Sequence, residues 1–172
     1  MTLRAALSLS HAPARAFAAM GAVWGSFAAT VPAIKAGLDA GDAAFGMALF
    51  CSALGLVLAM WLAPLTDARL GALALPLASA GLSIVFLGPV LAGNLVMFGA
   101  AMLLVGLCSG LTDVVMNARV SELEAAHDAP LMNLNHAMFS LAYMLGALLA
   151  GAVREAGLPM ILPFAFFAVA GA

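Results

Sequence analysis

Asp113 is a carboxylate in the middle of an otherwise apolar stretch, 106-GLCSGLTDVVMNARVSELE-124. Gly106, Gly110, Asp113 and Asn117 recur at helical spacing, so they share one face of a helix. A charged group deep in a membrane-spanning helix costs about 2.5–3.5 kcal/mol on insertion scales, and such groups usually face a cavity or a partner. Asp113 is therefore a candidate for binding a proton or a solute. The alternative is a helix-packing seam in which Asp113 reaches water near the membrane surface.

A second polar stripe lies in 131-LMNLNHAMFSLAYMLGALLAG-151, where Asn133, His136, Ser140 and Tyr143 recur at helical spacing. Histidine titrates nearest neutral pH, and a neighbouring carboxylate favours its protonated form. We expect His136 and Asp113 to lie at similar depths and to approach each other. The alternative is a structural histidine that bonds Ser140 or a backbone carbonyl.

Trp24 stands among small residues in the first apolar run of the chain. Its ring can stack on a ligand, or it can fill the interior of a helix bundle. The sequence thus predicts a substrate or proton pathway formed by Trp24, Asp113, Asn117, Asn133, His136 and Tyr143.

The motifs that would indicate other chemistry do not occur in the sequence. It has no phosphate-binding Walker loop, no HExxH or GxSxG motif and no cluster of cysteine and histidine. We therefore expect no metal, no cofactor and no enzymatic activity. The net charge is −2 and no basic run is present, so nothing indicates a nucleic-acid partner.

The composition shows which solvent surrounds these residues. Of the 172 residues, 66% are hydrophobic and 8% are charged, whereas soluble domains carry about 25% charged residues. Such a chain cannot cover a core with polar surface, so we expect a lipid bilayer around most of it.

A membrane-spanning helix needs about 20 predominantly apolar residues. The pattern predicts one all-helical transmembrane domain over 1–172, with spans at about 14–34, 43–65, 72–91, 95–118, 131–153 and 158–172, the last incomplete. Asn94 is expected to cap the fourth span, and Asp128 and Pro130 to begin the fifth.

A faint internal repeat relates the two halves of this pattern. A shift of 85 residues places 21-GAVWGSFAATVP-32 on 106-GLCSGLTDVVMN-117. Three spans followed by three equivalent spans have opposite orientations in the membrane, which is the inverted repeat of many secondary transporters. The small residues that coincide, Gly21 and Gly25 with Gly106 and Gly110, are expected to pack helices closely.

Basic residues predict the orientation. With a cytoplasmic N-terminus, four basic residues fall inside and two fall outside, which agrees with the positive-inside rule. The inside residues are Arg4, Arg15, Arg69 and Arg119, and the outside residues are Lys35 and Arg154. We expect a multi-pass protein of the cell inner (plasma) membrane with a cytoplasmic N-terminus.

The chain resembles the N-terminal half of a major facilitator superfamily transporter. The stretch 63-APLTDARLGAL-73 is similar to the family's cytoplasmic loop signature, Gly-x-x-x-Asp-Arg-x-Gly-Arg-Arg. Asp67, Arg69 and Gly71 match it in type, although one residue is inserted and the basic pair is missing. The run 112-TDVVMNARVSELEAAHDAPLMNLNHAMFSLAYMLGAL-148 is similar to a bacterial inner-membrane branch related to sugar-permease-like proteins.

The resemblance implies a 12-helix bundle in which two six-span halves enclose a central cavity. It also implies alternating access, commonly driven by protons, and a gate loop at Asp67, Arg69 and Gly71. The partners would be a small-molecule substrate and either the missing C-terminal half or a second copy. Two other interpretations stay open, which are a half-size transporter that dimerises and a membrane scaffold or assembly subunit that does not transport. The substrate and the direction of transport are not predicted.

Overall fold

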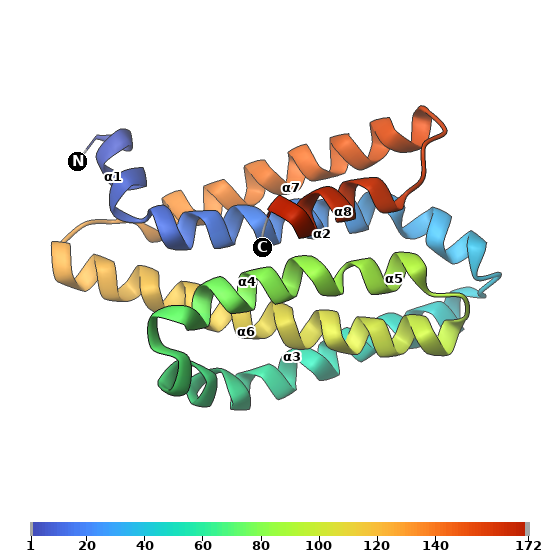
Figure 1. The fold of residues 1–172 in the computed structure, drawn as a ribbon, viewed down its shortest axis with the longest axis horizontal. Helices are drawn as coiled ribbons and strands as arrows, with labels where there is room; N and C mark the ends of the chain where they lie inside the picture. Colours follow the sequence, from blue (N-terminus) through green and yellow to red (C-terminus); the bar gives the residue numbers. More distant parts are fainter. Residues whose placement is uncertain (1, 171–172) are drawn as a thin grey trace.

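The computed structural model describes residues 2–170, and within them every regular element is helical (Figure 1). The bounds are α1 Leu3–Leu9, α2 His11–Gly37, α3 Asp42–Leu70, η1 Gly71–Leu73, α4 Ala74–Val85, α5 Leu87–Leu91, α6 Leu95–His127, α7 Met132–Glu155 and α8 Ile161–Ala170. The predicted all-helical class is confirmed. Residues 171 and 172 of the predicted sixth span lie outside the described residues.

Four helical segments of the described chain are long and apolar enough to cross a membrane. They are His11–Gly37, Asp42–Leu91, Leu95–His127 and Met132–Glu155. The second of these segments reverses direction at η1, so that α4 returns alongside α6 (Figure 1). Gly71 permits this reversal, because its φ of 53° is in the region that favours glycine. α8 is apolar but shorter.

The start of α6 agrees with the prediction, whereas the end of α6 does not. Asn94 caps the helix, because its side-chain oxygen accepts a hydrogen bond from the Met97 N–H at 2.9 Å. Asp128 does not begin the next helix as expected. It has φ 48° and ψ 48° and ends α6 in the left-handed conformation, which aspartate tolerates better than most residues. α6 therefore continues to His127, beyond the end expected at 118.

The first turn of α7 is capped by a side chain from α6. One carboxylate oxygen of Glu124 accepts hydrogen bonds from the backbone N–H groups of Leu131 and Met132, at 2.5 and 2.7 Å. A carboxylate at a helix N-terminus satisfies free N–H groups and interacts favourably with the helix dipole. Glu124 thus caps the helix that Asp128 and Pro130 were expected to begin.

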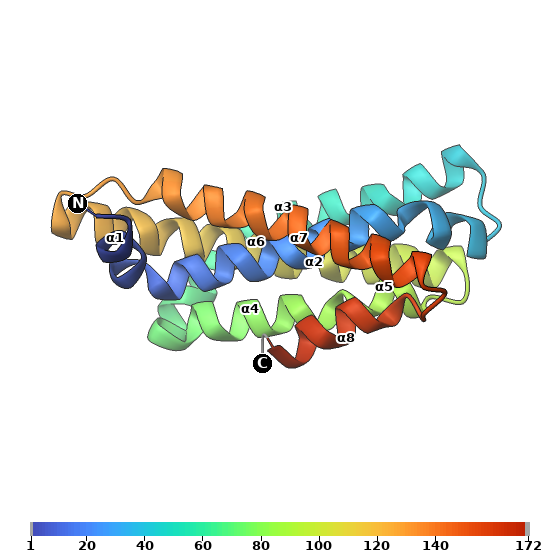
Figure 2. The ribbon, with the colours of Figure 1, turned by 90° about the horizontal axis from the view of Figure 1, so that it is seen from above.

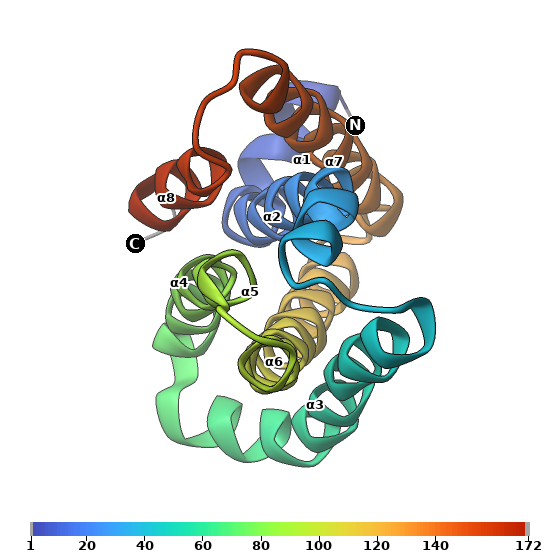
Figure 3. The ribbon, with the colours of Figure 1, turned by 90° about the vertical axis from the view of Figure 1, so that its right-hand side faces the viewer.

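The long helices pack as two close pairs, and one member of these pairs, α2, lies at the centre of the bundle. α3 lies along α6, and α2 lies along α7 (Figure 2). Viewed along the helices, α2 is in the middle and contacts α7 and α8 on one side and α4 and α6 on the other (Figure 3). α2 is accordingly the most buried of the four long segments.

Glycines let the paired backbones approach. A Cβ atom added at Gly25 would lie 2.0 Å from the carbonyl oxygen of Tyr143 in α7, and one at Gly106 would lie 1.9 Å from that of Ser52 in α3. Gly21 and Gly110 face the same two partner helices. Small residues at such positions maximise van der Waals contact, which drives helix association in lipid.

Aromatic rings fill the space between α2, α4 and α6. Phe86 packs edge-to-face on Trp24 and on Phe27, with ring centroids 5.1 and 5.8 Å apart. Phe98 stacks on Phe45 at 4.9 Å. Phe27, Phe86 and Phe98 are almost fully buried. The outer faces of α3 and α7 instead expose large apolar side chains, as expected of helices surrounded by lipid.

Candidate functional site

A cavity of about 380 Å³ lies between α2, α6 and α7. We call it the carboxylate cavity. Its walls are Phe17, Met20 and Trp24 from α2, Asp113 and Met116 from α6, and His136, Phe139 and Tyr143 from α7. The volume is within the range of about 300–1,000 Å³ that is usual for small-molecule sites. Four of the six predicted pathway residues, Trp24, Asp113, His136 and Tyr143, thus lie around one space.

Asp113 reaches this cavity from the middle of α6. Its side chain is exposed, and Asn117, one turn further along the helix, is its hydrogen-bond partner. The Asn117 amide donates to the carboxylate at 3.1 Å and to the Asp113 carbonyl oxygen at 2.8 Å. No lysine or arginine of the described chain pairs with Asp113. The carboxylate is therefore oriented by an amide, and its remaining acceptor sites are free to bind a proton or a ligand.

His136 faces Asp113 across the cavity from α7. Its Nδ1 lies 3.0 Å from the carbonyl oxygen of Met132. If Nδ1 carries the proton, Nε2 is left with a lone pair that can accept a proton from the cavity. The imidazole ring also meets Phe17 edge-on, with ring centroids 5.0 Å apart. The hydrogen bond to a backbone carbonyl that a structural histidine would make is therefore present. It leaves Nε2, the other ring nitrogen, available.

Trp24 and Tyr143 form two aromatic walls. The Trp24 indole N–H donates to the hydroxyl of Ser109 at 3.1 Å. Ser109 is buried in α6, so this bond holds the indole ring in place while the ring itself is only half-buried. Tyr143 is 36% exposed and packs at 6.0 Å against Phe139. Trp24 thus contacts both the bundle core and the cavity.

The other two predicted pathway residues do not line the cavity. Asn117 acts on it indirectly, through Asp113. Asn133 is exposed near the start of α7. The buried amide in this helix belongs to Asn135, whose Nδ2 donates to the Leu131 carbonyl at 2.8 Å and whose Oδ1 has no partner.

Sequence reasoning missed half of the cavity walls. Phe17, Met20, Met116 and Phe139 were not singled out, because apolar side chains are common throughout this chain. The signal was nevertheless present in the spacing. Met20, Met116 and Phe139 lie three or four positions from a polar or aromatic candidate on the same helical face, and Phe17 lies seven positions, or two turns, from Trp24.

The predicted gate-loop residues lie at the C-terminal end of α3. Two of them, Asp67 and Gly71, contact Arg119 of α6. One guanidinium nitrogen of Arg119 is 2.5 Å from the Asp67 carboxylate and 3.4 Å from the Gly71 carbonyl oxygen. The other nitrogen bonds both oxygens of Glu122, at 3.0 and 3.1 Å. Arg119 thus ties the end of α3 to α6, while Arg69 is exposed.

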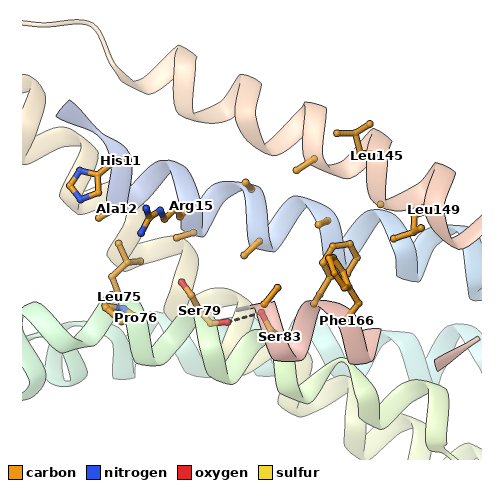
Figure 4. A pocket seen from close by; sticks show the side chains of 18 residues that line it. His11, Ala12, Arg15, Leu75, Pro76, Ser79, Ser83, Leu145, Leu149 and Phe166 are labelled. Atoms are coloured by element: carbon orange, nitrogen blue, oxygen red, sulfur yellow. Dashed lines mark hydrogen bonds between the residues drawn. The ribbon is translucent and has the colours of Figure 1, made fainter. Parts of the chain in front are cut away.

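A larger cavity, of about 800 Å³, lies between α2, α4, α7 and α8 (Figure 4). Alanine and leucine make up more than half of its walls, and His11 and Arg15 lie together at one end (Figure 4). Ser83 donates to the carbonyl oxygen of Ser79 rather than into the cavity. None of the predicted pathway residues lines this cavity, so the candidate site is the smaller one. Among residues 2–170, no group of three metal-ligating side chains occurs.

The long apolar helices, with Asp113 and His136 in a cavity between them, indicate a multi-pass membrane protein. Two curated relatives agree with this class. The chain is 32% identical over 140 residues to an uncharacterized transporter, y4wD, of Sinorhizobium fredii, covering 78% of this chain and 36% of the relative. It is 32% identical over 133 residues to an uncharacterized MFS-type transporter of Yersinia pestis, covering 77% of this chain and 35% of the relative.

The resemblance to the major facilitator superfamily (MFS) that the sequence indicated is supported by both relatives, because both are named transporters and one is named MFS-type. The chain spans about a third of the length of the curated relatives that it matches. No family profile matches the chain, and no solved structure does so significantly.

Proposed function

We propose that this chain is the N-terminal half of a secondary active transporter of the inner membrane. In this proposal the carboxylate cavity is one wall of a central pathway, and a small solute crosses by alternating access coupled to protons. The observation that carries the proposal is the meeting of Asp113 and His136 from two helices in one cavity between aromatic walls. Ionisable groups inside a membrane usually mark a substrate or proton path.

The helix pairing supports a bundle of six spans built from two repeats of three. In the proposed repeat, α2 corresponds to α6 and α3 to α7. The observed close pairs, α2 with α7 and α3 with α6, are then equivalent to each other under exchange of the two repeats. Trp24 and its partner Ser109 are 85 residues apart, the same shift that superimposes the repeats. In this arrangement α4 and α5 form the third span, and α8 belongs to the sixth.

In the proposed mechanism, Asp113 and His136 exchange protons with the side of the membrane to which the cavity is open. Asn117 keeps one oxygen of Asp113 oriented. Trp24 and Tyr143 contact the solute. The Asp113 carboxylate and the His136 imidazole act together in this mechanism, because both groups line the same cavity.

The ion pair of Asp67 with Arg119 is proposed to form the cytoplasmic gate, together with Gly71. It joins α3 to α6 at the end of the bundle that we assign to the cytoplasm, which contains Arg69 as well. Breaking or re-forming this contact would let the adjoining ends of α3 and α6 move relative to each other.

Proton-driven transport tests the proposal directly. The full-length protein is reconstituted into liposomes that contain the pH dye pyranine, and sugars, amines and carboxylates are added one class at a time. We expect at least one class to change the internal pH. The Asp113→Asn variant should abolish that change, whereas Asp39→Asn should preserve it because Asp39 is exposed at a helix end and outside the cavity. If no class moves protons, or if Asp113→Asn moves them normally, the coupling proposal is wrong.

The mass of the native gene product in the membrane fraction tests the half-transporter assignment. A product about twice the size of this chain agrees with two six-span halves. A product of 172 residues that purifies as a dimer would instead support two copies enclosing the pathway. A product of that size that stays monomeric and moves no solute would contradict transport.

A further inference from the structure

We propose that the carboxylate cavity selects a small organic cation with an apolar body, such as a quaternary or protonated amine. This inference rests on the proposed transport function and names the class of its substrate. It depends on three properties of the cavity, which are its charge, its aromatic faces and its shortage of hydrogen-bonding groups.

The cavity carries a net positive charge only when Asp113 and His136 are both protonated. In every other protonation state of this pair, its net charge is negative or zero. Asp113 is its one carboxylate, and no lysine or arginine of the described chain lines it. The basic residues near these helices are engaged elsewhere or face elsewhere. Arg119 is paired with Asp67 and Glu122, and Arg15 lines the larger cavity. An ionised Asp113 with a neutral imidazole opposite therefore lacks a cationic partner, which a cationic solute would supply.

The aromatic side chains suit a cation whose charge is spread over alkyl groups. The ring of Trp24 is fixed by the bond from its N–H to Ser109, so its π-face rather than its donor is available to a ligand. Phe17, Phe139 and Tyr143 add three further rings around the same space. Aromatic faces attract ammonium groups within about 6 Å through the ring quadrupole, and boxes of such rings recognise quaternary ammonium ligands.

Hydrogen-bonding groups are too few on this wall for a sugar. Besides Asp113, the polar side-chain groups that line it are the His136 imidazole and the Tyr143 hydroxyl. The Nδ1 of His136 is already engaged by a carbonyl oxygen. A polyhydroxylated solute would leave several hydroxyl groups without partners against phenylalanine and methionine, and unpaired polar groups in an apolar site are unfavourable.

The test is competition binding with matched probes. Radiolabelled phenyltrimethylammonium is bound to the purified full-length protein, and unlabelled phenyltrimethylammonium, tert-butylbenzene and glucose compete for it. tert-Butylbenzene has the same shape with carbon in place of the charged nitrogen. We expect displacement by the cation at a concentration at least tenfold lower than by the neutral isostere, and no displacement by glucose.

Variants separate the contributions of charge and aromatic face. Asp113→Asn should weaken phenyltrimethylammonium binding at least tenfold, and Phe139→Leu should weaken it several-fold. Asp39→Asn should bind as the wild type does, and each variant is first shown to melt at the wild-type temperature. Equal binding by Asp113→Asn, or equal displacement by the neutral isostere, would overturn the cation assignment.

The outcomes also separate this inference from the transport proposal. If a sugar moves protons in the liposome assay in an Asp113-dependent way, the transport function stands and the cation assignment is wrong. If phenyltrimethylammonium binds in an Asp113-dependent way but no solute moves protons, the cation site stands and proton coupling is wrong.

Discussion

Replacing Gly106 by alanine should disrupt the α3–α6 pair. A Cβ atom at this position would lie 1.9 Å from the carbonyl oxygen of Ser52, 2.6 Å from its carbonyl carbon and 2.8 Å from its Cα. Ordinary contact begins at about 3.4 Å, so the two backbones would have to separate by about 1.5 Å, the difference between 3.4 and 1.9 Å. Backbone atoms cannot rotate away as a side chain can, and the separation would loosen contacts along both helices.

Two opposing effects give the size of the change. Overpacking typically costs about 1–3 kcal/mol, and alanine regains up to about 1 kcal/mol of helix propensity over glycine. The contact at 1.9 Å is with the backbone, so the upper part of the overpacking range applies, and we expect a net loss of about 1–2 kcal/mol. This corresponds to a melting temperature lower by about 2–8 °C for a chain of this size.

A thiol-reactive dye can report the transition, because Cys51 in α3 and Cys108 in α6 are free and half-buried. The matched control is Gly151→Ala in α7, where an added Cβ would meet nothing within 4 Å. The control should melt at or slightly above the wild-type temperature. If Gly106→Ala melts no lower than Gly151→Ala, then α3 and α6 do not approach each other closely at Gly106.

Four further substitutions, used in three experiments, test contacts at and near the site. Asp67→Asn and Arg119→Gln should show a coupling of about 1 kcal/mol in a double-mutant cycle of thermal stability, since the pair is only partly exposed; strictly additive effects would argue against the contact. Glu124→Gln should lower stability by about 0.5–2 kcal/mol, because two N–H groups at the start of α7 lose a charged acceptor, and hydrogen exchange at those amides should quicken. Trp24→Phe should weaken phenyltrimethylammonium binding several-fold while the protein still melts normally, because the smaller ring is no longer held by the hydrogen bond to Ser109; a wild-type affinity would show that this hydrogen bond does not contribute to binding.

Membership in a class of protein could be predicted from local properties of the chain. Hydropathy and the shortage of charge indicate membrane helices, because lipid requires every backbone group to be paired within a helix or barrel. The helical spacing of polar residues around Asp113 and His136 identified two of the groups in the carboxylate cavity. This spacing is also a local property, because residues three or four positions apart share one face of a helix. The loop at Asp67 and the run from 112 to 148 indicated the family.

The ends of helices were harder to predict. Asn94 follows the local rule for an N-cap, since its partner Met97 is three residues away. The start of α7 depends instead on Glu124, which is seven and eight residues from the N–H groups that it binds. A rule that reads only neighbouring residues assigns this role to Asp128, which ends α6.

By itself, the sequence indicated a bundle of apolar helices long enough to cross a membrane, with a carboxylate and a histidine within two of those helices. Only the tertiary structure decided which side chains share a space with them. The rotation of each helix about its axis depends on packing against partners far along the chain, such as α7 against the glycines of α2. That rotation turns His136 and Tyr143 toward Asp113 and leaves Asn133 exposed. It also brings Arg119 to Asp67, 52 residues away.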